Sequence, residues 1–161
     1  MTEKYLRANG IKLAYDEFGP ADAKKAIVLV HGFSANRYEN WKRMGWYDAI
    51  AGKGMRGFAL DCRGHGESAK PHEPDKYGRQ AMARDVFALM DHAGVERAHL
   101  LGFSMGAHIA LAAAMTDGGR IDVRSRSEPL ASVITMSTGS VARPSSRSTV
   151  GTTRRAKVRS A

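Results

Sequence analysis

The sequence is poor in several features, and each shortage excludes a class of protein. It contains a single cysteine, Cys62, so a small secreted fold held together by internal disulfides is excluded. No apolar run reaches the roughly 20 residues that a membrane-spanning helix needs. The first residues lack the apolar core of a signal peptide. We therefore expect a soluble, cytoplasmic protein.

Aromatic, acidic and histidine side chains are missing from the later part of the chain. Every aromatic residue lies at or before Phe103, no histidine follows His108 and no acidic residue follows Glu128. The net charge of +9 is also uneven, because residues 120–161 hold nine of the 25 Lys and Arg but only two of the 16 Asp and Glu. The chain therefore changes character near residue 120.

What the sequence does contain is organised around residues 100–107, Leu-Leu-Gly-Phe-Ser-Met-Gly-Ala. An apolar run ends in this stretch and an alanine-rich run follows it, which predicts the strand, sharp turn and helix of a nucleophile elbow. Gly102 and Gly106 are small enough to let strand and helix approach. Ser104 is the candidate nucleophile, and the Met105 N–H at the helix start can face a developing oxyanion. A chance glycine–serine turn is the alternative, which the flanking strand and helix disfavour.

The residues before the elbow predict an α/β fold that begins with a hairpin. Residues 4–8 and 11–15 alternate polar and apolar side chains around Asn9-Gly10, the preferred pair for a tight hairpin. Three further strands and two helices are expected, the strands over 26–30, 57–60 and 98–103 and the helices over 40–52 and 77–93. This alternation predicts a mostly parallel sheet with helices on both faces.

Two polar loops that follow predicted strands are the other candidate parts of a site. His31-Gly32-Phe33 comes directly after the apolar strand 26–30, and Gly32 lets the loop fold tightly over the end of the sheet. The Phe33 N–H is the candidate second oxyanion donor. For His31, a hydrogen-bonded role that shapes the turn is favoured over a role as catalytic base.

The second loop, residues 61–68, reads Asp-Cys-Arg-Gly-His-Gly-Glu-Ser. Asp61 and His65 have the chemistry of a catalytic pair, but local hydrogen bonds that stabilise the loop are the favoured role for both. The remaining residues assigned to the motif, as structural parts of a tight turn, are Arg63, Gly64 and Gly66.

The three motifs, in this order and each at a strand end, resemble the α/β-hydrolase superfamily. The resemblance covers residues 4–115, and residues 130–137 resemble the strand that follows in that family. It implies a truncated α/β-hydrolase-like sheet, an ester- or acyl-type hydrolase, a small-molecule substrate, and neither cofactor nor metal. The serine argues against the dehalogenase and epoxide-hydrolase branches of the family, which use aspartate at this position.

The sequence also departs from the family pattern. In the family the catalytic acid and then the histidine follow the serine, whereas His108, four residues after Ser104, is the last histidine here. A serine hydroxyl is a poor nucleophile without a base that accepts its proton. We therefore expect a weakly active or inactive hydrolase, with a non-catalytic small-molecule binding module as the alternative.

The domain expected from these patterns covers residues 1–140, followed by a basic tail over 141–161. Residues 142–161 hold five Arg, four Ser and three Thr with no acid and no aromatic, so we expect them to be disordered. A frameshift near residue 140 is favoured as the origin of the tail over a functional basic segment, and residues 116–129 are a candidate for a separate insertion.

Two kinds of partner other than a small molecule follow from these segments. Polyanion binding through the tail is the less favoured one, because the tail has no aromatic side chain that could stack on bases. Self-association through the apolar edge strand at 130–137 is expected, because exposed strand edges pair with other chains. No membrane partner is expected.

Overall fold

The computed structural model describes residues 4–122 and 133–136. Within them, six strands form one sheet in the order β1-β2-β4-β3-β5-β6. The strands are β1 (Lys4–Ala8), β2 (Ile11–Phe18), β3 (Ala26–Val30), β4 (Arg56–Leu60), β5 (His99–Phe103) and β6 (Val133–Met136). The helices are the π-helical η1 (Tyr38–Lys42), α1 (Trp46–Ala51), the 3-10 helix η2 (Pro74–Tyr77), α2 (Arg79–His92), α3 (Met105–Thr116) and the 3-10 helix η3 (Gly118–Arg120).

The sheet is mostly parallel, as predicted. β3 pairs in parallel with β4 and β5, and β5 pairs in parallel with β6. The predicted hairpin of β1 and β2 is antiparallel and joins the sheet through β4. Its turn residues Asn9 and Gly10 have φ values of 50° and 80°, which is the left-handed conformation that a tight hairpin turn requires. The predicted fold class is confirmed.

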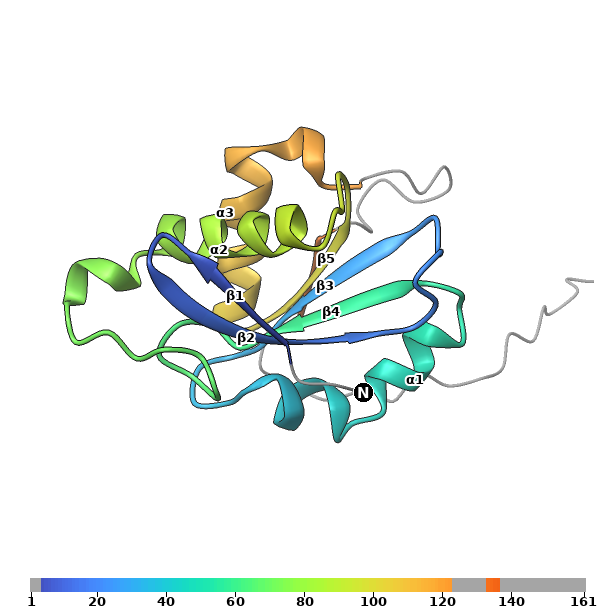
Figure 1. The fold of residues 1–161 in the computed structure, drawn as a ribbon, viewed down its shortest axis with the longest axis horizontal. Coiled ribbons are helices and arrows are strands. Elements are labelled where there is room, and N and C mark those ends of the chain that lie inside the picture. Colours follow the sequence, from blue (N-terminus) through green and yellow to red (C-terminus); the bar gives the residue numbers. More distant parts are fainter. Residues whose placement is uncertain (1–3, 123–132, 137–161) are drawn as a thin grey trace, which may run out of the picture.

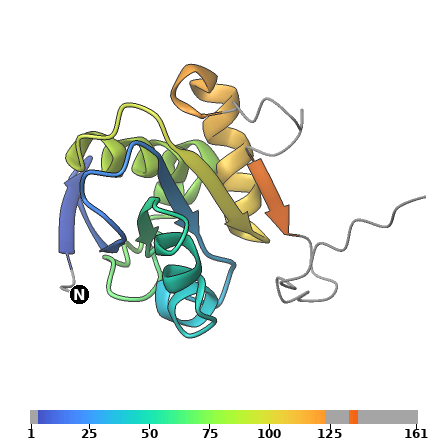
Figure 2. The same cartoon turned by 90° about the vertical axis from the view of Figure 1, so that its right-hand side faces the viewer.

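Helices cover both faces of the sheet (Figure 1). Alternate residues of the buried strands point to opposite faces, and they divide the core in two. On the side of α2 and α3 the core contains Val28 and Leu100, and on the side of η1 and α1 it contains Leu29 and Leu101, which pack with Trp41. Figure 2 shows β6 beside β5 at the flank that α3 covers.

The single helix predicted over 40–52 is wrong. The chain forms η1 and then α1, and the two are separated by Gly45, whose φ of 77° is left-handed and cannot continue a right-handed helix. The helix predicted over 77–93 is largely confirmed, but α2 begins at Arg79 because Gly78 is extended and η2 precedes it.

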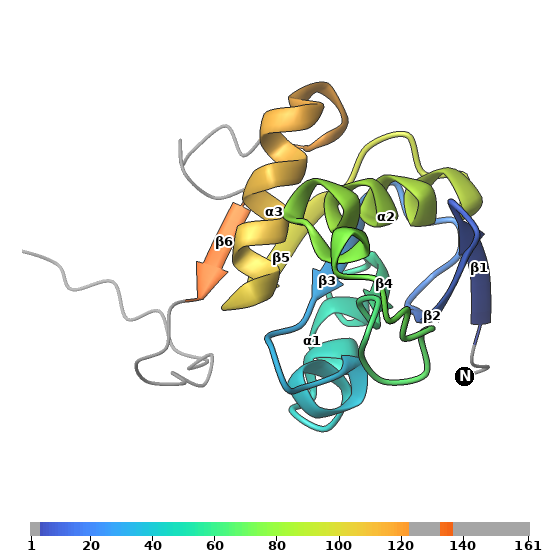
Figure 3. The same ribbon diagram turned by 90° about the vertical axis from the view of Figure 1, so that its left-hand side faces the viewer.

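β6 lies at the end of the strand order, on the side of the sheet opposite the hairpin (Figure 3). It supplies four residues of the strand expected over 130–137, and the rest of that range lies outside the described residues. The expected tail, 141–161, also lies outside them, so the division at residue 140 stays a prediction. No helix in the described part of the chain is long and apolar enough to cross a membrane.

The register of the parallel strands places the three sequence motifs at one edge of the sheet. Val30, the last residue of β3, is paired with Leu60 of β4 on one side and with Gly102 of β5 on the other. The loops that begin at His31 and Asp61 and the turn at Ser104 therefore leave the sheet at the same level.

Candidate functional site

The turn at Ser104 has the backbone strain expected of a nucleophile elbow. Ser104 joins the end of β5 to the start of α3 with φ 52° and ψ −111°. A serine side chain rarely adopts a positive φ, and such outliers gather at functional sites where the surrounding structure enforces them. The residue is only partly buried. The hydroxyl is therefore held on a strained turn at an accessible position.

Two glycines make this turn possible. A side chain at Gly102 would collide with the backbone of Gly106, and a side chain at Gly106 would collide with the carbonyl group of Val30. α3 therefore packs directly against the backbones of β3 and β5. The close approach predicted for Gly102 and Gly106 is present, and only glycine satisfies it.

The Ser104 hydroxyl has no hydrogen-bond partner within residues 4–122 and 133–136. His108, one turn along α3, is exposed, and its Nδ1 lies 3.2 Å from the Ser104 backbone oxygen rather than at the hydroxyl. All six histidines of the sequence lie in the described part of the chain. None of the six therefore hydrogen-bonds the Ser104 hydroxyl.

The oxyanion loop, residues 31–36, contacts the elbow directly. A Cβ at Gly32 would lie 2.8 Å from the Phe103 ring, so the loop lies against the residue that precedes Ser104. In the described residues, neither the Phe33 N–H nor the Met105 N–H has a hydrogen-bond acceptor. Two unpaired donors beside a strained serine are what an oxyanion hole requires. The assignment of both donors stays a prediction.

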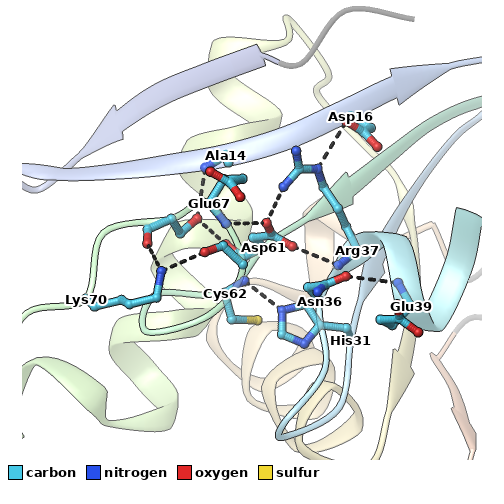
Figure 4. Close-up of polar contacts among 12 residues, drawn as sticks. Ala14, Asp16, His31, Asn36, Arg37, Glu39, Asp61, Cys62, Glu67 and Lys70 are labelled. Atoms are coloured by element: carbon cyan, nitrogen blue, oxygen red, sulfur yellow. Dashed lines mark hydrogen bonds and ion pairs between the residues drawn. The ribbon is translucent and has the colours of Figure 1, made fainter.

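His31 holds the oxyanion loop in place. Its ring is fully buried and its Nε2 accepts a hydrogen bond of 3.0 Å from the Cys62 N–H, so the proton is on Nδ1, which donates to the Gly32 carbonyl oxygen at 2.8 Å (Figure 4). Burial lowers the pKa of His31, and this effect outweighs the hydrogen bond to Gly32 and the nearby Asp61, both of which raise the pKa. Both ring nitrogens are occupied, so His31 cannot take a proton from Ser104.

Asp61 binds the oxyanion loop to the loop 61–68. Its fully buried carboxylate accepts hydrogen bonds from the Arg37 N–H at 2.7 Å and the Glu67 N–H at 2.9 Å, and it pairs with the Arg37 guanidinium (Figure 4). A side chain at Gly66 would collide with this carboxylate. His65 is not part of the network, because its Nδ1 lies 3.1 Å from the Arg63 carbonyl oxygen.

The ring of His65 instead makes edge-to-face contacts with the rings of His31 and Phe33, which both belong to the oxyanion loop. Its ring centroid is 5.1 Å from that of His31 and 5.7 Å from that of Phe33. The Phe33 side chain is 74% exposed. His65 and Phe33 together form an aromatic surface beside the oxyanion loop.

Arg63 anchors the loop 61–68 to α2. Its guanidinium donates to both carboxylate oxygens of Asp85, at 2.7 and 2.6 Å, and to the Lys76 carbonyl oxygen at 2.6 Å. Both partners of the ion pair are buried, and burial raises the pKa of Asp85 although Arg63 opposes the rise. Gly64 has φ 83° and lies against the Tyr77 ring.

Sequence reasoning missed four residues that build this site, namely Asp16, Arg37, Asn40 and Asp85. Asp85 could have been noticed as a charge on the apolar face of the predicted helix, in the same stripe as Met82 and Leu89. The other three have no periodic signal, because they meet their partners only in the folded chain.

Comparison with known proteins agrees with this geometry. A family model described as the alpha/beta hydrolase fold matches residues 25–156. The chain belongs to the α/β-hydrolase family. The matched range continues beyond residue 115, where the recognisable motifs end.

The curated relatives of this α/β-hydrolase chain carry different names, and several are named epoxide hydrolases. Epoxide hydrolase A of Mycobacterium tuberculosis is 31% identical over 120 residues, and a putative 2-succinyl-6-hydroxy-2,4-cyclohexadiene-1-carboxylate synthase of Bacillus subtilis is 29% identical over 114 residues. The alignments cover 74% and 71% of this chain but 36% and 39% of the two relatives. The chain therefore spans less than half the length of the relatives that it matches.

Solved structures show the same fold. Epoxide hydrolase A from Mycobacterium thermoresistibile superposes with a TM-score of 0.68 and 29% identity, over 74% of this chain and 36% of that one. The thioesterase domain from the curacin biosynthetic pathway superposes with a TM-score of 0.66 over 74% of this chain and 43% of that one. At 23% identity, this second likeness shows the fold alone.

Proposed function

We propose that this chain carries the nucleophile and the oxyanion hole of a serine-dependent α/β-hydrolase site for small-molecule ester or acyl substrates. The observation that carries the proposal is the strained Ser104, which lies between Phe103 and Met105 in the chain. Gly32, which precedes Phe33, lies against Phe103. The N–H groups of Phe33 and Met105 have no acceptor in the described residues. Strain of this kind persists only where the surrounding structure enforces it.

In the proposed reaction, Ser104 Oγ attacks the carbonyl carbon of an ester. The carbonyl π bond breaks, and the negative oxygen of the tetrahedral intermediate accepts hydrogen bonds from the Phe33 and Met105 N–H groups. The serine proton goes to solvent water, since no histidine hydrogen-bonds the hydroxyl in the described residues. The intermediate then collapses to an acyl-serine as its C–O bond to the ester's alcohol breaks and the protonated alcohol leaves. Turnover should therefore be slow, since general-base catalysis contributes on the order of 10²–10⁴-fold.

Esters and acyl groups are proposed rather than epoxides, although several relatives are named epoxide hydrolases. Attack of a serine hydroxyl on an epoxide carbon would open the ring and leave an alkyl ether on Ser104. Water does not cleave an ether under mild conditions, so the enzyme would stop after one event. Attack on an ester instead leaves an acyl-serine, which water can hydrolyse.

A non-catalytic binding module is the second candidate function. The unpaired Ser104 hydroxyl favours it, because a serine without a base can still line a ligand site. In that case a small acyl compound would bind beside the aromatic surface of Phe33 and His65 without being cleaved.

The test combines labelling with turnover. A fluorophosphonate probe should label Ser104 slowly, as peptide mass spectrometry would show, and Ser104→Ala should abolish the labelling. Ser34→Ala is the matched control, because Ser34 is an exposed serine with φ 59° in the neighbouring loop. It should leave the labelling unchanged.

Hydrolysis of p-nitrophenyl acetate should be weak, and Ser104→Ala should remove the part of it that passes through an acyl-serine. A hydrolysis rate typical of the family, lost in Ser104→Ala, would show that one of the six histidines serves as the base and that slow turnover is wrong. Absence of label on Ser104 in the folded protein would contradict the nucleophile assignment.

A further inference from the structure

The loop that carries the Phe33 N–H contains a glycine, Gly32, whose backbone is free to adopt several conformations. Gly32 lies between the strand β3 and Phe33, and glycine loses more conformational freedom on ordering than any other residue. A Cβ at this position would lie 2.8 Å from the Phe103 ring, so little room is left for a side chain. A position with freedom in its backbone and little space around it therefore precedes a proposed catalytic N–H.

Hydrogen bonds on both sides of Gly32 compensate for this freedom. Its carbonyl oxygen accepts the His31 Nδ1–H at 2.8 Å, and its N–H donates to Asn40 Oδ1, also at 2.8 Å. The Gly32 carbonyl and the Phe33 N–H belong to one planar trans peptide group and point in opposite directions. The His31 bond therefore orients the Phe33 N–H, and the Asn40 bond fixes the peptide group before it.

The backbone around Asn40 is also held in place by hydrogen bonds and ion pairs. Its backbone N–H donates to the Asn36 carbonyl oxygen at 3.1 Å, within the turn that begins η1. Arg37, in the same turn, is bound to the buried Asp61 through its backbone N–H and its side chain. Its Nε lies 3.1 Å from Asp16 Oδ1, and Asp16 also accepts the Tyr47 hydroxyl at 3.0 Å. A buried polar network thus fixes the element that carries Asn40.

We infer that Asn40 is a positioning residue for the oxyanion hole, acting through the Gly32 N–H to hold the Phe33 amide at Ser104. This inference rests on the proposed function. The role requires an acceptor oxygen at the end of a short side chain, since only Asn40 Oδ1 is engaged by Gly32. The amide nitrogen of the side chain is not required.

The variants follow from that requirement. Asn40→Ala removes the acceptor and leaves the Gly32 N–H without its partner. Asn40→Asp keeps an oxygen at the same place and should restore most of the function. Glu39→Gln is the matched control, because it changes the neighbouring side chain of η1, which pairs with Arg43 at the surface, and leaves the Gly32 bond intact.

The measurement is the kinetics of Ser104 labelling by a p-nitrophenyl phosphonate, separated into reversible binding and the covalent step. Asn40→Ala should slow the covalent step by about 10- to 100-fold, the cost of a misplaced catalytic group, and leave reversible binding unchanged. Asn40→Asp and Glu39→Gln should label at close to the wild-type rate. Equal covalent rates in Asn40→Ala and the wild type would overturn the inference, as would equally slow rates in Asn40→Ala and Asn40→Asp.

A second readout separates this inference from the proposed function. The amide signal of Gly32 in ¹H–¹⁵N spectra should move upfield and exchange faster with solvent in Asn40→Ala, or in Asn40→Ser if the alanine variant does not fold. An unlabelled Ser104 in the wild type would defeat the proposed function. An unchanged Gly32 signal in a labelled protein would defeat only the role of Asn40.

Discussion

Helices α2 and α3 pack against each other on one face of the sheet, and each fixes one loop of the candidate site. α2 holds the loop 61–68 through the buried ion pair of Arg63 and Asp85, which are charged groups with directed hydrogen bonds. α3 contains no charged residue and holds the elbow through backbone contacts at Gly106. We call the first contact the ion-pair anchor, because it depends on the charged side chains of Arg63 and Asp85. We call the second the steric anchor, because it depends on the absence of a side chain at Gly106.

The two anchors should fail in different ways when they are changed. Removing one member of a buried ion pair leaves the other charge without compensation. Adding an atom to a close backbone contact forces the two elements apart. The outward face of α3 differs from α2 as well, because Leu111 and Met115 are 50% and 81% exposed.

The largest expected effect is at the ion-pair anchor. Asp85→Ala should lower the free energy of unfolding by about 3–5 kcal/mol, because the Arg63 guanidinium stays buried without its carboxylate. Urea unfolding followed by circular dichroism measures the loss. The double variant Arg63→Met/Asp85→Leu should recover much of it, and a double variant as unstable as Asp85→Ala would show that the loop needs the charges themselves.

The next effect is at the steric anchor. Gly106→Ala should cost about 1–3 kcal/mol of stability through overpacking against the Val30 carbonyl, and it should also slow labelling of Ser104. Gly118→Ala is the control, because a Cβ there meets nothing within 4 Å. Both measurements use urea unfolding, and equal stabilities of the two variants would show that α3 can shift at no cost.

A smaller effect on the free energy of unfolding is expected from the protonation of His31 at low pH. Burial holds the pKa of His31 below 6.5 in the folded protein, so the unfolded chain binds a proton that the folded chain does not. Stability should therefore fall as the pH drops below about 6.5, by at most about 1.4 kcal/mol per pH unit.

Unfolding titrations between pH 8 and 5 would measure this slope. The groups facing the ring are Asp61, His65 and Arg37, and their influence is smaller than that of burial. His31→Gln should flatten the slope, whereas His72→Gln, at an exposed position, should keep it. A slope that survives in His31→Gln would assign the pH dependence to another group.

Substitutions on the exposed face of α3 should have the smallest effect on stability, but they should change self-association clearly. Large apolar side chains that are exposed on one helix favour association, so the exposed Leu111 and Met115 should promote self-association. Leu111→Lys/Met115→Lys should shift the protein toward monomer in sedimentation velocity and change the unfolding midpoint little. Gln80→Lys/Arg84→Gln, on exposed positions of α2, should leave association unchanged.

The sequence revealed the steric anchor but not the ion-pair anchor. Gly102 and Gly106 could be predicted because the need for a small residue is local and leaves a fixed spacing around Ser104. The strands β3 and β5 and the hairpin were also predictable, since apolar runs and Asn9-Gly10 act over a few residues. Pairings between distant residues, such as Arg63 with Asp85 or Gly32 with Asn40, leave no local pattern. The break at Gly45 was missed because the helical spacing of the aromatic residues predicted one continuous helix. The left-handed backbone at Gly45, which ends that helix, leaves no sign in the spacing.

The strand order also has a consequence for the time course of folding. The hairpin of β1 and β2 closes over a two-residue turn and can form within about 1–10 μs. β3 and β5 pair Ile27 with His99, and such distant parallel pairing is intrinsically slow because a long loop must close first. Pulse-labelled hydrogen exchange should therefore find the amides of β2 protected before those of β5. On this account Ser104 stays an ordinary flexible serine until β5 pairs with β3, and the reactivity proposed for it depends on that pairing.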